Sequence, residues 1–363
     1  MKKLLLTLTV TAFGMFSYAQ DDLTPDEIKY RDSIATLNQS NAALVTSQNA
    51  YNAGIEAFKT GNYSGAITKF SESIAADPHY TPAYYNKAIA ENKAEKYNDA
   101  LKTCDQLIKM KPGYSKAYFQ RGRAYQGLNN YLAAETDYLK SIELDPKNPK
   151  AYYNFGTLRF MQQDYTGAIT QFTKVIELDP TDAYAYNDRG SCYRMLEKYP
   201  EAVRDYEEAA KKNPNLAFVL NNIGTTKHKM KMYDEAIRAF NRALSVDANF
   251  YLAYLNRGVT QMTLNHVDDA VNDFTKCIEI NPAFAPGYSN RSGAYFVKKE
   301  YAKAKEDADK AIQLDAADAD AYINRGNARE MLRDMDGACE DWHKARELGS
   351  EIGKYYHSQN CSN

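Results

Sequence analysis

The sequence predicts an all-α fold in which pairs of helices stack as a solenoid, and three observations support this fold class. A 34-residue unit repeats nine times in strict register. Within each half of the unit the apolar residues follow helical spacing, with no alternating runs. Position 20 of the unit is alanine in all nine copies, and position 8 is glycine in seven. A fixed period of this length indicates units that bury their apolar faces against their neighbours. The copies begin at Ser47, Thr81, Ser115, Pro149, Ala183, Ala217, Tyr251, Ala285 and Ala319.

Each copy is predicted to hold helix A at positions 2–14, a short turn, and helix B at positions 18–30. A glycine inside a helix costs about 1 kcal/mol relative to alanine. Seven glycines at position 8 therefore imply that two helices cross too closely there for a larger side chain. Position 24 is a large aromatic residue in seven copies, and position 32 is proline in six, which marks the end of helix B.

This combination of period, small residues and aromatic residues resembles the tetratricopeptide repeat. The resemblance covers residues 47–352. It implies a right-handed superhelix of nine helix-turn-helix repeats whose A helices line a concave groove. It also implies a scaffold or adaptor that binds protein or peptide segments in that groove.

The first 19 residues have the pattern of a secretory signal peptide. Lys2 and Lys3 precede the short apolar run Leu4–Phe16, and Ser17-Tyr18-Ala19 forms a cleavage site that leaves Gln20 as the mature end. We therefore expect an exported protein of bacterial type, periplasmic or secreted. After removal of the signal, no stretch is apolar enough to span a membrane.

The segments that flank the repeats are expected to be helical. Residues 20–46 contain a helix start at Thr24-Pro25, which predicts a helix over Pro25–Asn38 followed by a polar link into the first repeat. The sequence leaves open whether this segment caps the array or is loosely held. Residues 353–363 form a C-terminal cap, and Ile352, Tyr355 and Tyr356 are expected to cover the last helix B.

Charge and cysteine content narrow the classes of partner and compartment. The formal charge of −2 gives no basic excess, so nucleic acid is not an expected partner. Cys104, Cys192 and Cys277 fall at interior positions of the repeat. The remaining two cysteines, Cys339 and Cys361, are predicted to form a disulfide that ties the cap to the last helix B.

Positions 7 and 23 of the repeat vary together. Five copies have arginine at position 7 and aspartate at position 23, and the other four have neither. We infer a structural ion pair between helices A and B of one repeat; descent from a duplicated subset of repeats is the alternative explanation. The predicted pairs are Arg121–Asp137, Arg189–Asp205, Arg257–Asp273, Arg291–Asp307 and Arg325–Asp341.

The family resemblance places groove residues at positions 2, 5, 6, 9, 12 and 13. Position 6 is nearly always an amide, which can both donate to and accept from a peptide backbone. Position 5 is aromatic in the first four copies, and these rings either face a ligand or pack between A helices. The candidate groove residues of these kinds are Tyr51, Asn52, Tyr85, Asn86, Phe119, Gln120, Tyr153, Asn154, Phe160, Asn222, Asn256, Asn290 and Asn324.

Charge is distributed unevenly along the predicted groove. Repeats 1–6 carry mainly bases at groove positions, including Lys116, Arg123 and Lys150, whereas repeats 7–9 carry only the acids Asp320 and Glu330. A cleft lined by one sign of charge concentrates its field. We therefore expect the basic part of the groove to bind an acidic segment that tolerates aromatic contacts; a solvated face with a chance bias is the other explanation.

The sequence shows no pattern of catalytic residues. It has no phosphate loop, no nucleophile-elbow serine and no zinc-type histidine motif, and its five histidines are scattered. We therefore expect no enzyme activity, no cofactor and no metal. The predicted function is a non-catalytic scaffold in the bacterial envelope. The alternatives are a protein that binds glycans or envelope polymers through the tyrosine-rich half, and an architectural protein that self-associates.

Overall fold

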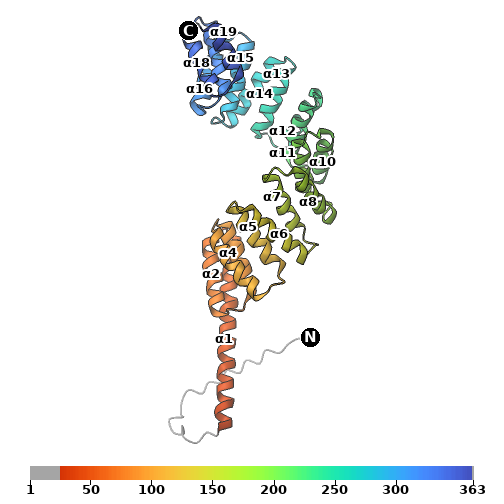
Figure 1. Ribbon diagram of the computed structural model, residues 1–363, viewed down its shortest axis with the longest axis vertical. Helices are drawn as coiled ribbons and strands as arrows, with labels where there is room; N and C mark the ends of the chain where they lie inside the picture. The colour runs from red at the N-terminus through yellow and green to blue at the C-terminus, as the bar shows by residue number, and fades with distance from the viewer. Residues whose placement is uncertain (1–24, 362–363) are drawn as a thin grey trace. The chain divides into compact units, whose positions relative to one another are not determined.

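The computed structural model describes residues 25–361, and all regular structure within that range is helical (Figure 1). The chain divides into two compact units, Met1–Leu144 and Asp145–Asn363, which are described separately. The predicted signal peptide lies outside the described residues. Within the described range no helix is both long and apolar enough to cross a bilayer.

The first unit contains the first three repeats. Each helix packs against the next one along the chain, and the A helices also contact one another, α1 with α3 and α3 with α5. The helices are α1 (Pro25–Lys59), α2 (Tyr63–Ala76), α3 (Thr81–Lys93), α4 (Tyr97–Met110), α5 (Ser115–Gly127) and α6 (Tyr131–Leu144).

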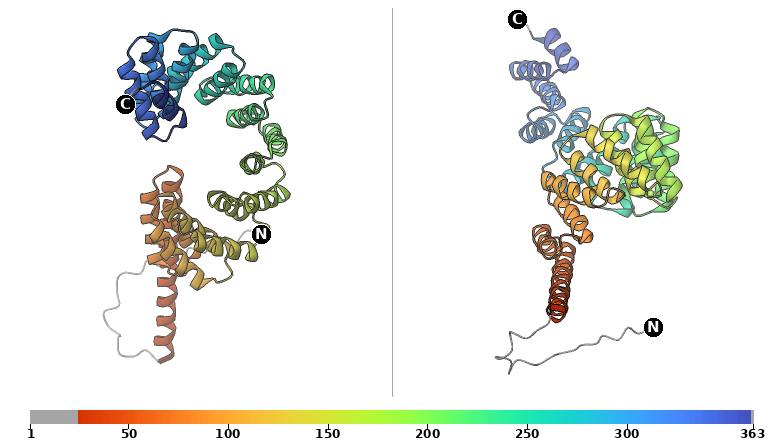
Figure 2. Two further views of the ribbon diagram at one scale, coloured as in Figure 1. Left: turned by 45° about the horizontal axis from the view of Figure 1, so that its top comes forward. Right: turned by 60° about the horizontal axis from the view of Figure 1, so that its bottom comes forward.

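The second unit contains repeats 4–9 and the C-terminal cap, and its helix pairs follow one another in chain order (Figure 2). The A helices α11, α13, α15 and α17 form a row in which each contacts the next. The helices are α7 (Pro149–Met161), α8 (Tyr165–Leu178), α9 (Ala183–Met195), α10 (Tyr199–Lys212), α11 (Ala217–Lys229), α12 (Tyr233–Val246), α13 (Tyr251–Thr263), α14 (Val267–Ile280), α15 (Ala285–Val297), α16 (Tyr301–Leu314), α17 (Ala319–Met331), α18 (Met335–Glu347) and α19 (Glu351–Asn360).

The helix boundaries agree with the predicted repeat to within a residue, except at the two ends of the array. In the fourth repeat, for example, helix A covers positions 1–13 and helix B covers positions 17–30. The turn between them places position 15 in the left-handed region of the backbone in all nine copies. Only Gly61 is a glycine there. Two copies have asparagine, which tolerates this conformation, and the other six have side chains that disfavour it, such as Lys231 at φ 62°.

The glycines at position 8 are explained by the aromatic rings at position 24. A Cβ atom added to Gly258 would lie 2.6 Å from the Cε1 atom of Phe274, far closer than two such atoms approach. The two copies without glycine, which have Ala88 and Ser292, carry small residues at position 24. Ring and glycine therefore occur together, because the ring fills the space that a side chain at position 8 would need.

All five predicted arginine–aspartate pairs are present. In each pair the guanidinium donates two hydrogen bonds to the aspartate carboxylate, as in Arg189–Asp205 with distances of 2.7 and 2.8 Å. The same arginine also donates from Nη1 to position 25 of the preceding helix B, where Thr173 accepts from Arg189. The hydrogen bonds of the other four arginines follow this pattern.

We call each arginine with its two acceptors an arginine clamp. One clamp joins three helices, helix A and helix B of one repeat and helix B of the repeat before it, so it links neighbouring repeats as well as the two halves of one. The Arg121 side chain is 22% exposed and that of Asp137 only 4%. The hydrogen bond to Asp137 raises the pKa of Arg121, so the arginine keeps its charge.

The N-terminal segment differs from the prediction. The predicted helix starts at Pro25 but does not end near Asn38, and α1 instead runs without interruption to Lys59. The prediction of a polar link is therefore wrong. Residues 39–46 are helical, because no glycine or proline interrupts them and the first repeat continues their helix. The apolar side chains of this extension, Ile34, Leu37 and Leu44 among them, are exposed.

The C-terminal cap is helix α19, which packs against α18 and α17. The predicted disulfide between Cys339 and Cys361 joins α18 to the end of α19. Tyr356 covers the last helix B, with its ring stacked on Trp342 at a centroid distance of 5.4 Å. Ile352 and Tyr355 do not, since they are 55% and 62% exposed. Ile352 lies in the first turn of α19, where it borders a hollow on the A-helix side.

The other three cysteines are free and buried, as the repeat register predicts. Burial raises the pKa of Cys192 to about 12 and that of Cys277 to about 11, so neither thiol ionises near neutral pH.

Candidate functional site

The amides at position 6 act first as ties between neighbouring A helices. Asn222 donates from Nδ2 to Oδ1 of Asn187 at 3.0 Å, and Asn256 donates in the same way to Asn221 at 2.9 Å. In each case the acceptor is position 5 of the preceding repeat. In the first unit Asn86 donates to the hydroxyl of Tyr51 at 2.7 Å. The repeat pattern predicts a ligand-facing role for these amides and does not reveal this structural one.

The other position-6 amides follow the chemistry of their neighbours. Asn324 donates to the backbone oxygen of Ser289, and Asn290 donates to the carbonyl of Pro286 in its own helix, because Leu255 offers no acceptor at position 5. Asn154 likewise donates within its own helix. Gln120 is buried, and Asn52 accepts from Gln48.

The aromatic side chains of the first four repeats contact rings of neighbouring helices. Tyr153 meets the ring of Phe172 at 5.6 Å, Phe119 is only 8% exposed, and Tyr51 contacts Phe70. Phe160 packs against the first tyrosine of the next helix B. These rings therefore pack against neighbouring helices, and two of them also border open hollows, Tyr153 beside Lys150 and Phe160 beside Asp188.

Tyr85 and the predicted bases of the first unit lie together on α3 and α5. Lys116 is exposed, and its Nζ lies 5.9 Å from the centre of the Tyr85 ring. Arg123 is half-buried and donates to Oε1 of Gln120 at 3.3 Å. These two cations lie on one helix, so the first unit has a basic patch of limited extent.

In the second unit the surroundings of Lys150 are of mixed charge. Lys150 borders a hollow of about 340 Å³ that Asp179 and Asp182 also line. Next to it, the Tyr153 hydroxyl donates to Asp188, the one acid among the position-6 residues. Burial raises the pKa of Asp188 against the opposing hydrogen bonds from Tyr153 and Asn187. An acidic ligand would meet these carboxylates, so the local charge does not favour one here.

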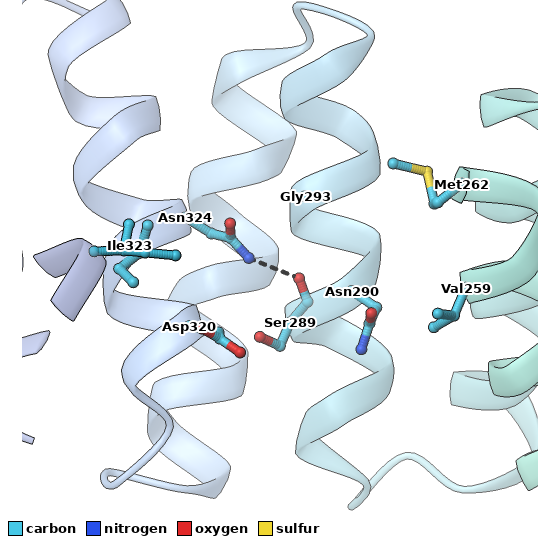
Figure 3. A pocket seen from close by; sticks show the side chains of 9 residues that line it. Val259, Met262, Ser289, Asn290, Gly293, Asp320, Ile323 and Asn324 are labelled. Atoms are coloured by element: carbon cyan, nitrogen blue, oxygen red, sulfur yellow. Dashed lines mark hydrogen bonds between the residues drawn. The ribbon is translucent and has the colours of Figure 1, made fainter. Parts of the chain in front are cut away.

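The A-helix face of repeats 7–9 contains a hollow of about 360 Å³, which the residue pattern alone does not predict. Figure 3 shows its side chains coming from α13, α15 and α17. Apolar groups stand at both sides, and amide and carboxylate groups lie between them. The lining residues are Val259, Met262, Ser289, Asn290, Gly293, Asp320, Ile323, Asn324 and Ile352.

Gly293 opens the floor of this hollow. It is the only glycine at position 9 of the nine copies. An added Cβ would lie 3.7 Å from Nδ2 of Asn324, which is an ordinary contact. Helix packing therefore does not require this glycine, in contrast to the glycines at position 8. Apart from Ile352, every lining residue sits at a predicted groove position, so the repeat register together with this glycine would have located the hollow.

The described residues contain no group of three or more histidine, cysteine, aspartate or glutamate side chains placed to hold a metal ion.

Three features of the repeats agree with the family resemblance. They are helix pairs of the predicted length, buried alanines at position 20, and the pairing of an aromatic ring with a glycine. Models of the tetratricopeptide repeat match residues 51–115, 119–183, 181–249 and 251–284. The chain belongs to the tetratricopeptide repeat family.

Solved structures of this family share the fold. A tetratricopeptide repeat protein from Parabacteroides merdae is 20% identical with a TM-score of 0.55, over 68% of this chain and 99% of that one. The C-terminal part of a repeat-containing protein from Cytophaga hutchinsonii is 18% identical with a TM-score of 0.55, over 66% and 98%.

A longer relative is found in the APC/C hetero-tetramer Cut9–Hcn1, at 16% identity and a TM-score of 0.52, over 73% of this chain and 52% of that one. This chain therefore spans about half of that protein. At these identities the likeness concerns the fold alone. A comparison with curated proteins gave no match.

Proposed function

We propose that this tetratricopeptide repeat protein is a non-catalytic scaffold that binds extended segments of other proteins on the A-helix face of its repeats. The hollow over α13, α15 and α17 carries this proposal. Its volume suits one or two side chains of a peptide rather than a folded partner. Val259, Met262 and Ile323 provide apolar contacts, while Asn290 provides an amide for the peptide backbone.

The chemistry of the hollow also favours one kind of segment. Asp320 is the only charged residue that lines it, and the groove positions of repeats 7–9 carry no base. An apolar side chain next to a lysine or arginine would satisfy both the apolar walls and this carboxylate. For this part of the chain the proposed ligand is therefore basic and apolar, unlike the acidic segment expected from the bases of repeats 1–6.

We also propose that the protein is exported to the bacterial envelope, as a periplasmic or secreted protein. The support for this is the pattern of residues 1–19, with its basic start, short apolar run and small-residue cleavage site. Mass spectrometry of the mature chain from its source cell should find Gln20 at the N-terminus, and an intact Met1 would contradict export by this route.

Binding can be tested with phage-displayed random 12-residue peptides panned against the chain from Gln20 onward. The affinity of the most enriched peptide is then measured by fluorescence polarisation. The variant Gly293→Leu fills the hollow and should weaken binding by about 10-fold or more, as misfit of a side chain in an apolar pocket does. Glu279→Leu adds the same side chain to an exposed position on α14 and serves as the matched control.

Two results would contradict the proposal. No enriched peptide, or equal affinity for wild type and Gly293→Leu, would remove the hollow as a peptide site. Binding of soluble glycans that is lost in Tyr85→Ala and Tyr153→Ala would instead favour the glycan-binding alternative.

A further inference from the structure

Two side-chain pairs connect the last two helices, α18 and α19. The disulfide between Cys339 and Cys361 is the first pair. His343 and His357 form the second, with ring centroids 5.2 Å apart. Cys339 and His343 lie four residues apart on α18, so their side chains share a face. Cys361 directly follows the last residue of α19, four residues after His357. The two histidines are 14 residues apart in the sequence, with no metal-site spacing, and the fold brings them together.

All four side chains line one open hollow of about 520 Å³. The carboxylates Asp336 and Glu340 line the same hollow. Neither cysteine of the disulfide is fully buried, so a reductant and a metal ion can both reach the site. The three free cysteines, in contrast, are buried within the repeats.

The four side chains form a donor set that zinc prefers. Zinc in structural sites is held tetrahedrally by cysteine thiolates and neutral histidines. Two imidazoles on one tetrahedral zinc place their ring centroids about 5 Å apart, since each Zn–N bond is about 2.0 Å long. Glu347 Oε1 also lies 3.6 Å from Nδ1 of His343. A carboxylate beside one ring nitrogen orients the ring and leaves the other nitrogen for a metal.

With this disulfide intact, the described residues hold no group of three or more side chains placed to bind a metal ion. We propose that reduction of the disulfide, which frees both sulfur atoms, creates a zinc site formed by Cys339, His343, His357 and Cys361. A dithiol supplies two electrons and two protons, the S–S bond breaks to give two thiols, and the dithiol is oxidised to its own disulfide. Zinc then displaces the two thiol protons and forms two Zn–S and two Zn–N bonds. The complex is neutral, because two thiolates balance the charge of the ion.

The site changes the chemistry that holds the cap without releasing the cap. In the oxidised chain a covalent bond ties α19 to α18. In the reduced chain the metal would tie the same two helices at the same place. The array would therefore keep its C-terminal cap in both oxidising and reducing surroundings.

Cobalt(II) titration of the full chain from Gln20, without an affinity tag, tests the proposal. Cobalt takes zinc sites and shows a thiolate-to-cobalt charge-transfer band. The chain is compared in its oxidised form and after reduction by a phosphine, and zinc is added last. We expect one equivalent of cobalt bound with the thiolate band in the reduced form, displacement by zinc, and no such band in the oxidised form.

Variants identify the ligands. The double variant His343→Asn/His357→Asn keeps the disulfide and should weaken cobalt binding by about 100-fold or more, since even loss of an outer-shell partner costs 10–100-fold. The triple variant Cys104→Ser/Cys192→Ser/Cys277→Ser should bind as wild type does. The single tryptophan, Trp342, stacks on Tyr356 of the cap, and its fluorescence reports whether the cap stays docked in each form.

Three results would overturn the proposal. They are absence of the thiolate band in reduced chain whose cap is still docked, equal cobalt binding before and after reduction, and unchanged binding in the histidine double variant.

Discussion

A matched pair of glycine-to-alanine substitutions tests the two roles that glycine has in this array. Gly293 and Gly258 both lie inside A helices, so alanine gains about 1 kcal/mol of helix propensity at either position. At Gly293 the added methyl meets only an ordinary contact of 3.7 Å. We therefore expect Gly293→Ala to raise the free energy of unfolding by about 1 kcal/mol.

At Gly258 the same methyl would lie 2.6 Å from the Cε1 atom of the fully buried ring of Phe274. Overpacking of this kind costs about 1–3 kcal/mol, which offsets the gain in propensity and leaves a net loss of about 0–2 kcal/mol. The two variants should therefore differ by about 1–3 kcal/mol in opposite directions from wild type.

Urea unfolding followed by far-ultraviolet circular dichroism gives the comparison. Because repeat arrays can unfold in more than one step, the transition midpoints are compared for chains of identical length. A lower midpoint for Gly293→Ala, or a higher one for Gly258→Ala, would refute the assignment of the two glycines. Gly293→Ala should also weaken peptide binding, though less than Gly293→Leu, so that stability and affinity change in opposite senses.

Three further predictions concern the clamps, the turns and pH. A double-mutant cycle on Arg257→Ala and Asp273→Ala should give a coupling free energy of about 1–3 kcal/mol, since the pair is bidentate and its aspartate is 6% exposed. Lys231→Gly should raise the free energy of unfolding by up to about 1 kcal/mol by removing a left-handed lysine at φ 62°, as measured by urea unfolding. Burial, with a smaller effect from Lys229, lowers the pKa of His228 in the folded chain below that of an unfolded histidine. The unfolded chain therefore binds the proton more readily, so this contribution to stability is present above pH about 6.5 and is lost as the pH falls below it. Thermal unfolding of wild type and His228→Gln between pH 7.5 and 5.5 should show a weaker pH dependence in the variant.

Each of these outcomes has a control or a contrary result. A coupling energy near zero would mean that Arg257 and Asp273 act independently. Asn265→Gly should change stability less than Lys231→Gly, because asparagine tolerates the left-handed region better than lysine does, and equal effects would contradict the strain argument. For His228, an unchanged pH dependence in the glutamine variant would assign the effect to other groups.

The fold could be predicted from the sequence because the nine copies serve as their own comparison. Position 20 is a fully buried alanine throughout, and positions 7 and 23 vary together where the structure has hydrogen bonds. The third contact of each arginine could not be found in this way, because its acceptors at position 25 are of several residue types, such as Thr173 and Asn241. The register of one helix against the preceding repeat decides that contact.

The candidate site was harder to predict for a related reason. An asparagine at position 6 looks the same in the sequence whether its amide faces a ligand or ties two helices together. Only the presence of an acceptor at position 5 of the preceding repeat distinguishes the two roles. The hollow of repeats 7–9 depends on the side chain that Gly293 lacks. Glycine carries no side chain that could bind a ligand, so the sequence does not mark Gly293 as part of a site, although its missing side chain leaves room for the hollow.

The arginine clamps bear on how the second unit would respond to a pulling force. The clamps of Arg257, Arg291 and Arg325 are consecutive, and their acceptors lie on α12, α14, α16 and α18. Every helix from α12 to α18 is therefore part of one continuous chain of cross-links. We expect a load applied to any one of these seven helices to be shared by the others through these hydrogen bonds, so that the stretch resists extension as a unit. The clamp of Arg189 joins only α8, α9 and α10. Between it and the clamps of α12 to α18, the amides of Asn222 and Asn256 tie α9 to α11 and α11 to α13, so neutral hydrogen bonds replace the charged ones there.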